Sequence, residues 1–552
     1  MSVFIGYPSF MAYQMMKGKR GNNDGFPSIP GMIARYSALG LTNEQMATNP
    51  VWVDKTGNGR DLQMKNFAWK DGSGISDVYL GALVFDGVDD YGVCDNFPVL
   101  TKEKGYTVVA LRQYLFNATD NKIRSLVTNA PSSIVSRSTL TFELIGSNGK
   151  KMNFSFGRGD LVSDFEPNAF SYMTSKSYNG KTITPGDVTE SNKRILVGNF
   201  SENGKYGSNV AIWELVFLDH DATEEELTKI KDYFVKTYPW LFPDQAWTVT
   251  GKTNEDEDRA TIANITGNGN DLVLSNVAFS ENSGYGSYPF GMNVWNPDYI
   301  ADQPYGTVHY PNDSKSYATT VKNNATNFRI KFRLRGLPEG GSFLIRVFDM
   351  NDLNTVLKTY TYTENGIHEF VYNDPNKPAR IILYNGNTIS NISEFYLDII
   401  PEYEGYLITD GVDDMIGSAG FEIGKDFTII GEWKFMDNII ANAGISKALS
   451  LFVYNTNNGL RIFINNTTKG PVLNTKTLKA ICSDGRVYSD DWSETIDNEE
   501  QPITSSKGSL LIGINGNNFA KIALKNLAIY NQILSKDDCI KAYNYLQTLK
   551  AK

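Results

Sequence analysis

The stretch TGNGRDL at residues 56–62 decides the fold, because it occurs a second time as TGNGNDL at residues 266–272. Two further landmarks follow each copy in the same order, namely DGVDD at 86–90 and 410–414 and an ungapped similarity between 211–234 and 523–546. Three landmarks that recur in one order indicate a duplicated domain.

The spacing of the landmarks predicts an insertion in the second copy. Asp61 and Asp86 lie 25 residues apart, whereas Asp271 and Asp410 lie 139 apart. About 114 extra residues are enough for a small domain, and exposed loop tips accept such insertions. We therefore predict an arm at residues 1–35 and a first domain at 36–242. A second domain, split between 243–298 and 401–552, carries an insert at 299–400.

The composition favours a mostly β chain. Its 552 residues are 41% hydrophobic and include 48 Gly, 30 Tyr and 30 Phe, which are turn and strand formers. The net charge of −10 disfavours nucleic-acid partners. No run of 18 apolar residues occurs, so no membrane insertion is expected.

Local patterns predict particular elements. Thr223 with Glu226, and Ser535 with Asp538, have capping-box spacing at the start of two amphipathic helices. In the insert, FRIKFRLR at 328–335 alternates apolar and basic residues, as a half-buried antiparallel strand does. The basic face of this strand suits binding of an acidic partner or a glycan. Alternatively, its charges protect an exposed sheet edge from aggregation.

The three cysteines predict no disulfide framework and no zinc site. Cys94, Cys482 and Cys539 are far apart in the sequence and form no CxxC pair. We expect them to be small core residues.

Residues 1–35 show no strand or helix period and no secretion signal, because their apolar part is short and precedes the basic residues. We predict an arm that packs on its own first domain or, alternatively, docks in a partner, as Met and aromatic side chains suit adaptable interfaces. The candidate attachment residues are Phe4, Tyr7, Phe10, Met11, Tyr13, Met15, Met16, Lys17, Lys19 and Arg20.

The landmarks resemble those of the laminin-G-like, concanavalin-A-like lectin and glucanase superfamily. The resemblance rests on the turn at 54–62, on FDGVDDY at 85–91 and on the closing strand and helix at 211–234, and it is looser in the second copy. It implies two jelly-roll sandwiches of curved antiparallel sheets, the second interrupted by an immunoglobulin-like or carbohydrate-binding-module-like sandwich.

In overall style the chain is similar to structural proteins of tailed phages of gut Bacteroidetes, notably the crAss-like group. This likeness implies a head fibre, tail fibre or capsid decoration protein on the virion surface. The arm would then attach it to other virion proteins, and projecting fibres of this kind are usually homo-oligomers.

No catalytic constellation emerges. Retaining glucanases need two carboxyls about 5 Å apart, but Glu494 and Asp497 lie at the wrong offsets and residues 255–258 (EDED) have no strand around them. Isolated histidines offer neither a triad nor metal-ligand spacing. We therefore expect no enzyme activity.

The DGVDD signature has two interpretations. Asp89 with Asp90, or Asp413 with Asp414, would supply carboxylates to calcium. We favour a tight turn in which Asp accepts backbone hydrogen bonds, and we expect no cofactor or metal.

Exposed aromatics would carry glycan binding, for which the candidates are Trp69, Tyr79, Tyr91 and Trp492. Each is alternatively a core or interface residue, because aromatic side chains dominate burial. The function we predict is a non-enzymatic virion protein that displays lectin-like domains to host or mucus glycans. The alternatives are a bacterial surface or secreted glycan-binding protein and, less favoured, a glucanase.

Overall fold

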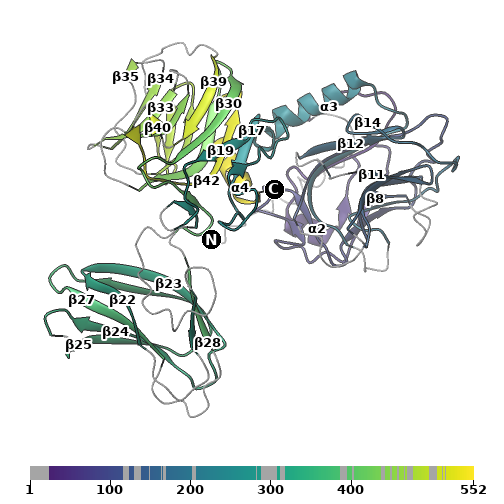
Figure 1. The fold of residues 1–552 in the computed structure, drawn as a ribbon. Coiled ribbons are helices and arrows are strands. Elements are labelled where there is room, and N and C mark those ends of the chain that lie inside the picture. Colours follow the sequence, from purple (N-terminus) through teal and green to yellow (C-terminus); the bar gives the residue numbers. More distant parts are fainter. Residues whose placement is uncertain are drawn as a thin grey trace, which may run out of the picture.

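The structure is a computed structural model. It describes residues 24–551 except for 116–122, 130–138, 148, 163–164, 166–168, 202–206, 281–282, 287–306, 311–317, 353, 386–394, 401–402, 437–441, 448–450, 457–458, 465–466, 469–476, 497–505, 513 and 516–517. The described chain is mostly β and its strands pair antiparallel, which confirms the predicted class of β-sandwich domains (Figure 1).

The first sandwich has two eight-stranded sheets, which we call the β16 sheet and the β8 sheet. The β16 sheet runs β14 (Lys181–Thr182), β13 (Ser177–Tyr178), β12 (Phe170–Thr174), β7 (Thr107–Tyr114), β16 (Asn209–Leu218), β5 (Leu83–Asp86) and β4 (Gly74–Ile75), with β1 (Met32–Ser37) also on β16. The β8 sheet runs β11 (Arg158–Val162), β10 (Lys151–Ser155), β9 (Leu140–Ile145), β8 (Arg124–Thr128), β15 (Ile195–Val197), β6 (Tyr91–Cys94), β3 (Leu62–Lys65) and β2 (Val51–Trp52).

The second sandwich repeats this plan with the β42 sheet and the β39 sheet. The β42 sheet runs β20 (Gly284–Tyr285), β29 (Leu407–Ile408), β42 (Ile522–Tyr530), β31 (Thr428–Phe435), β36 (Thr477–Cys482), β37 (Arg486–Ser489) and β38 (Glu494–Ile496), with β17 (Gln245–Thr248) also on β42. The β39 sheet runs β18 (Thr261–Ile262), β19 (Leu272–Ser275), β30 (Met415–Ile423), β39 (Ser506–Ile512), β32 (Asn442–Lys447), β33 (Leu451–Thr456), β34 (Gly459–Ile464) and β35 (Thr467–Thr468). A small hairpin joins β40 (Ile514–Asn515) to β41 (Asn518–Phe519).

Two four-stranded sheets carry the strands of the insert. One runs β21 (Thr307–Tyr310), β28 (Phe395–Ile400), β23 (Asn327–Arg335) and β26 (Gly366–Asn373), and the other runs β22 (Ala318–Ala325), β27 (Ala379–Asn385), β24 (Phe343–Asp349) and β25 (Val356–Tyr362). The predicted alternation in β23 is confirmed, because Phe332 and Leu334 lie in the core while Lys331 and Arg333 are exposed.

The place of the insert follows from matching turns in the two copies. In the first copy the Ser76 amide donates to the Ala82 carbonyl, and in the second the Gly286 amide donates to the Tyr406 carbonyl. The chain between Gly286 and Tyr406 therefore replaces the five residues 77–81 of the first copy. Such a turn is a surface position at which an insertion breaks few contacts.

The TGNG motif is a structural loop in both copies. The Asp54 carboxylate accepts hydrogen bonds from the amides of Arg35 and Thr56, at 3.1 and 2.9 Å. Asn264 does the same in the second copy, accepting from Ala246 and Thr266 at 3.2 and 3.1 Å. The motif thus ties its own turn to the first strand of each copy.

Helices cover the outer faces of the sheets. α3 (Glu224–Thr237) and α4 (Lys536–Gln547) begin at the predicted caps Thr223 and Ser535, and their predicted stripes pack on the β16 and β42 sheets. The short helix α2 (Asn43–Thr48) was not predicted; Thr42 and Gln45 form its capping box. Among the described residues, none of the helices has the length and apolarity needed to span a membrane.

The two sandwiches share an apolar cluster built around α4 and the 3-10 turn η2 (Pro239–Leu241). The Tyr530 hydroxyl donates to the Trp240 carbonyl at 2.9 Å, and Lys541 lies 4.3 Å from the Trp240 ring centroid. Gln113 on β7 donates to Thr548 just after α4, at 2.9 Å. α4 therefore packs between the sandwiches (Figure 1).

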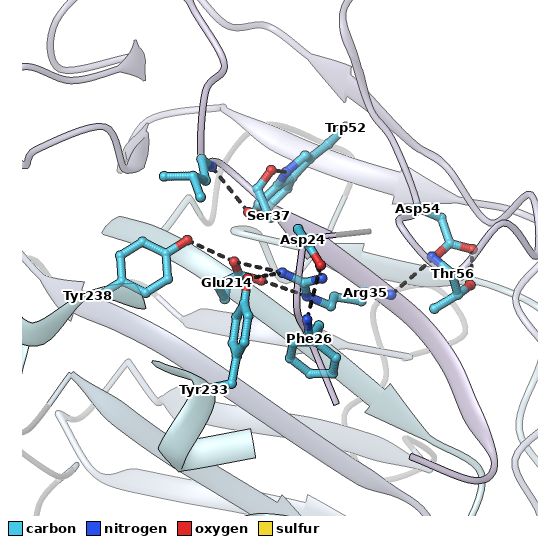
Figure 2. A network of polar contacts seen from close by, with 11 residues as sticks. Asp24, Phe26, Arg35, Ser37, Trp52, Asp54, Thr56, Glu214, Tyr233 and Tyr238 are labelled. Carbon is cyan, nitrogen blue, oxygen red and sulfur yellow. Dashed lines mark hydrogen bonds and ion pairs between the residues drawn. The ribbon is translucent and has the colours of Figure 1, made fainter. Parts of the chain in front are cut away.

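The predicted arm needs a correction at its end. We expected no strand before residue 36, but β1 begins at Met32 and pairs along β16. Phe26 and Ile29 are also buried in the shared cluster. The pattern was missed because β1 is buried on both faces and so shows no alternation. Arg35 on this strand joins a buried polar network with Glu214 (Figure 2).

Candidate functional site

A row of aromatic, lysine and carboxylate side chains crosses the outer face of the β42 sheet. We call it the aromatic–lysine surface, and it consists of Tyr406, Glu432, Lys434, Lys479, Trp492, Lys525 and Tyr543. On β31 the side chain of Trp433 is fully buried in the sandwich core, so the flanking Glu432 and Lys434 face outward. All seven residues are half-buried.

One half of the surface is centred on Tyr406. Its hydroxyl donates a hydrogen bond to Glu432. Lys525 Nζ lies 3.7 Å from Glu432 Oε2 and 5.8 Å from the Tyr406 ring centroid. Lys434 Nζ lies 4.8 Å from the same centroid. The ring thus holds two ammonium groups by cation–π attraction.

The other half is centred on Lys479. Its Nζ lies 5.2 Å from the Trp492 ring centroid and 4.9 Å from that of Tyr543, and it donates to the Asp490 carbonyl. The two rings meet edge to face at 5.6 Å. Tyr543 also interacts with the Glu432 carboxylate, which raises the pKa of the Tyr543 hydroxyl and joins this half to the first. The surface is therefore one connected network.

The electrostatics fix the protonation of the network. Burial alone would raise the pKa of Glu432, but the hydrogen bond from Tyr406 and the charges of Lys525 and Lys434 outweigh it, so the pKa lies below its ordinary value. Burial and the contact with Glu432 raise the pKa of both Tyr406 and Tyr543. The carboxylate is therefore charged, and both tyrosines remain neutral hydrogen-bond donors.

Irregularities in the sheet place two of these side chains. The register between β31 and β36 shifts between Ile430 and Trp433, and that between β36 and β37 shifts between Leu478 and Ala480. A β-bulge of this kind redirects a side chain and is common beside functional sites. Lys479 is the extra residue in the second shift.

The first copy lacks this surface at the matching positions. The repeat alignment and the strand registers put Ala82 where the second copy has Tyr406, Leu111 where it has Glu432, and Trp213 where it has Lys525. Those three side chains are at most 1% exposed and belong to the apolar cluster. A requirement of the shared fold would recur in both copies, so the surface is a feature of the second copy and not of the shared fold.

Of the four aromatic residues predicted from the sequence, only Trp492 lies in this surface. Trp69 stacks on Phe67 at 4.8 Å against the first core, and Tyr79 packs on the shared cluster. Tyr91 begins β6 and is half-buried. The described contacts join none of the four to another. The candidate attachment residues from Phe4 to Arg20 lie outside the described residues.

The DGVDD signatures form closely similar turns. Asp86 accepts from the Val88 amide at 2.7 Å, and Asp90 accepts from the Asp86 amide at 3.0 Å. Asp410 and Asp414 make the matching bonds at 2.7 Å each. The carboxylates of each turn lie close enough to hold a cation, and backbone amides donate to one oxygen each of Asp86, Asp90, Asp410 and Asp414, as the favoured turn interpretation expects.

The structure describes only one of the two carboxylates considered together for hydrolysis, Glu494 and Asp497. Glu494 is exposed at the start of β38, and Asp497 lies outside the described residues. The strand forms because β38 pairs with β37 through a turn in which Asp491 accepts from Ser493 at 2.8 Å. The absence of enzyme activity stays a prediction.

An open hollow of about 660 Å³ lies in the first sandwich, beside the turn between β10 and β11. Its lining is mostly glycine and backbone, with Arg158 and Asp187 as its charged side chains. It contains no aromatic ring, so it offers fewer contacts to a ligand than the aromatic–lysine surface does.

Comparisons with known proteins give only distant likenesses. No family model matches the sequence, and no curated protein sequence matches it. A Trypanosoma rangeli sialidase in complex with sialic acid shares 12% identity over 42% of this chain and 38% of its own length, with a TM-score of 0.27. A botulinum neurotoxin type C structure, described by the dependence of cell entry on two ganglioside molecules, shares 10% identity over 68% of this chain and 98% of its own, with a TM-score of 0.28.

The binding domain of botulinum neurotoxin DC, in complex with rat synaptotagmin II, shares 10% identity over 90% of this chain and 99% of its own, with a TM-score of 0.28. The chain thus spans well under half the length of the sialidase that it matches. Likenesses at these TM-scores carry no argument about the function of this chain.

The sequence reasoning missed Tyr406, Tyr543 and the three lysines. A signal existed in Lys434 and Lys525, because each is a charged residue within a largely apolar strand. Only the register of β31 on β42, however, brings the two lysines over one tyrosine ring.

Proposed function

We propose that this chain is a non-enzymatic glycan-binding protein and that the aromatic–lysine surface is its binding site. The observation that carries the proposal is the connected network of three rings, three ammonium groups and one carboxylate on the outer face of the second sandwich. Sugars present hydroxyl groups beside patches of C–H. The ammonium groups and the carboxylate of the surface offer hydrogen-bond partners to the hydroxyl groups, and the rings hold the ammonium groups in place.

The position of the surface supports this proposal. It lies on a broad sheet rather than in a deep cavity, which suits an extended chain of sugars. Glu432 is its only carboxylate and is committed to Tyr406, Tyr543 and Lys525. Hydrolysis needs a second carboxyl that can donate a proton, so binding without cleavage is the role that this residue set supports.

The finer proposal is a virion protein, namely a head or tail fibre or a decoration protein that displays the two lectin-like sandwiches as a homo-oligomer. It rests on the resemblance in sequence style and on the predicted attachment arm. The alternative is a bacterial surface or secreted glycan-binding protein with the same binding surface.

A glycan array tests the binding role. We expect the full chain to bind a subset of glycans and Trp492→Ala to lose most of that binding, because Trp492 is a half-buried ring of the surface. Trp69→Ala is the matched control, since Trp69 packs on the first sandwich. Full binding by the Trp492 variant, or loss in the Trp69 variant alone, would contradict the assigned site.

Quantitative mass spectrometry of density-gradient particles tests the virion role. A virion protein bands with capsid protein at a fixed copy ratio and survives a high-salt wash. Removal of residues 1–35 is unsuitable as a probe of attachment, because it deletes part of β1. Removal of residues 1–23 avoids this strand and should release the protein from particles without unfolding it.

A further inference from the structure

We infer that the aromatic–lysine surface takes an anionic saccharide, whose carboxylate or sulfate groups bind the ammonium groups of Lys434, Lys479 and Lys525. This inference rests on the proposed function and adds the chemical class of its ligand. Three observations carry it: an excess of positive charge, the coverage of the rings by lysines, and the comparison with the first copy.

The excess of positive charge is local. Within the described part of the chain, Lys434 has no carboxylate within ion-pair distance, and the polar partner of Lys479 is the neutral Asp490 carbonyl. Only Lys525 pairs with an acid, Glu432. The nearby Asp491 carboxylate accepts from Ser489 at 2.7 Å instead.

This excess is unusual for the chain as a whole, whose net charge is −10. Half-buried ammonium groups lose part of their hydration, and three of them share the rings and the single Glu432 carboxylate as compensation. An anionic ligand supplies the missing charge and recovers this cost. A neutral ligand would bury the ammonium groups further and supply no counter-charge.

The lysine ammonium groups also lie over the faces of the aromatic rings. Their Nζ atoms lie 4.8 Å from the Tyr406 centroid, 4.9 Å from that of Tyr543 and 5.2 Å from that of Trp492. A site for neutral sugars uses open ring faces, on which the C–H face of a sugar stacks. Here a ligand meets ammonium groups that the rings hold in place, so charge-assisted hydrogen bonds dominate its contacts.

The lysines are specific to the second copy. Lys434 corresponds to Gln113 and Lys525 to Trp213 in the first copy, and neither of those residues is charged. The two copies share their turns, caps and strand registers. The difference in charge is therefore confined to the copy that carries the surface.

Matched pairs of polysaccharides test the ligand class on the full chain. Polygalacturonate and its methyl ester differ in the carboxylate charge, and dextran sulfate and dextran differ in sulfate. We expect one acidic member to bind at least about tenfold more tightly than its neutral partner, with an affinity that falls as salt rises. The two pairs distinguish a carboxylated ligand from a sulfated one.

Variants that remove one lysine charge test whether the acidic polysaccharide binds at the aromatic–lysine surface. Lys434→Gln and Lys479→Gln should each weaken acidic binding about tenfold, since each removes one charge-assisted contact. Lys65→Gln, an exposed lysine of β3 in the first sandwich, is the matched control and should bind as the unchanged chain does. An equal loss in all three variants would show general polyanion binding and overturn the inference.

The outcomes separate this inference from the function on which it rests. Binding of neutral and acidic partners alike, lost with Trp492→Ala but not with the lysine variants, overturns the anionic ligand and keeps glycan binding. Binding to neither acidic polysaccharide also overturns the inference. If no glycan on the array binds, the proposed function fails as well.

Discussion

Arg35 and Glu214, 179 residues apart in the sequence, form a two-point ion pair on the outer face of the β16 sheet, beneath α3 (Figure 2). Arg35 Nε lies 3.1 Å from Glu214 Oε2, and Nη2 lies 3.2 Å from Oε1. Tyr238 donates to the same carboxylate at 2.8 Å, and Asp24 accepts from Arg35 Nη1 at 2.7 Å. The pair fixes β1 on β16 at the point where the chain enters the sandwich.

Removing the cation should destabilise this sandwich strongly. Arg35→Met leaves the fully buried Glu214 carboxylate without its counter-charge, and we expect a loss of about 3–5 kcal/mol in the free energy of unfolding. Hydrogen exchange of β1 and β16 peptides, followed by mass spectrometry, measures the loss where it occurs. Unchanged protection of these peptides would contradict the account of the pair.

The second copy supplies the compensating control. It has Ala246 and Asn526 at the positions of Arg35 and Glu214, and that copy folds without the ion pair. The double variant Arg35→Ala with Glu214→Asn should therefore recover about half of the loss or more, because no buried charge remains. A double variant less stable than Arg35→Met would show that the charges themselves stabilise the fold.

The loop motif gives a second prediction, with the duplication as its guide. Asp54→Ala leaves buried amides of Arg35 and Thr56 without an acceptor and should cost about 3 kcal/mol. Asp54→Asn should cost about 1 kcal/mol or less, because Asn264 accepts the matching bonds in the second copy. Urea unfolding curves of the two variants measure this difference, and equal losses would refute the role of the loop acceptor.

The DGVDD turns predict a pH dependence of stability. Burial raises the pKa of Asp90 to about 7 and that of Asp414 to about 6. The folded chain therefore holds a proton at each site over a pH range in which the unfolded chain, with an ordinary carboxyl pKa of about 3.9, has released it. Stability should fall as pH rises from about 4 to about 7, and then level off.

The variant Asp90→Asn isolates this effect. It removes the charge, so its unfolding midpoint should exceed that of the unchanged chain at pH 8 and match it near pH 4. Asp89→Asn, in the same turn but less buried, should change the pH profile far less, because its charge contributes least to the raised pKa of Asp90. A rise of the pH 8 midpoint on adding calcium, lost in Asp90→Asn, would instead support the cation site.

The cysteines give a fourth prediction. Cys94, Cys482 and Cys539 are all buried and free, which confirms the expectation of small core residues. A thiol reagent should label none of the three in the folded protein, and all three in urea. Labelling of Cys539 at low urea, before Cys94, would show that α4 separates from the β42 sheet ahead of global unfolding.

Much of the fold could be predicted because repeated motifs report local geometry. The TGNG loop, the DGVDD turn and the helix caps each satisfy backbone groups within a few residues, so their sequence signatures are short. β1 escaped prediction because its residues are buried on both faces. The long spacing between Asp271 and Asp410 sufficed to predict the insert.

The candidate site could not be assembled in the same way. Lys434, Lys479 and Tyr543 belong to three elements and Tyr406 precedes a fourth, β29, so their meeting depends on strand register, two bulges and the docking of α4. Composition identified Trp492 as a candidate but also three aromatic residues that pack elsewhere. All four are half-buried, so only their contacts separate them, and these contacts form only in the folded chain.

One measurement tests the central claim most directly, namely hydrogen exchange of the full chain with and without the best-bound glycan of the array. The account predicts that protection gained on binding is confined to β31, β36, β42 and the segments around Tyr406, Trp492 and Tyr543. Protection centred on the hollow beside Arg158, on β23 of the insert, or on the first sandwich alone would contradict it.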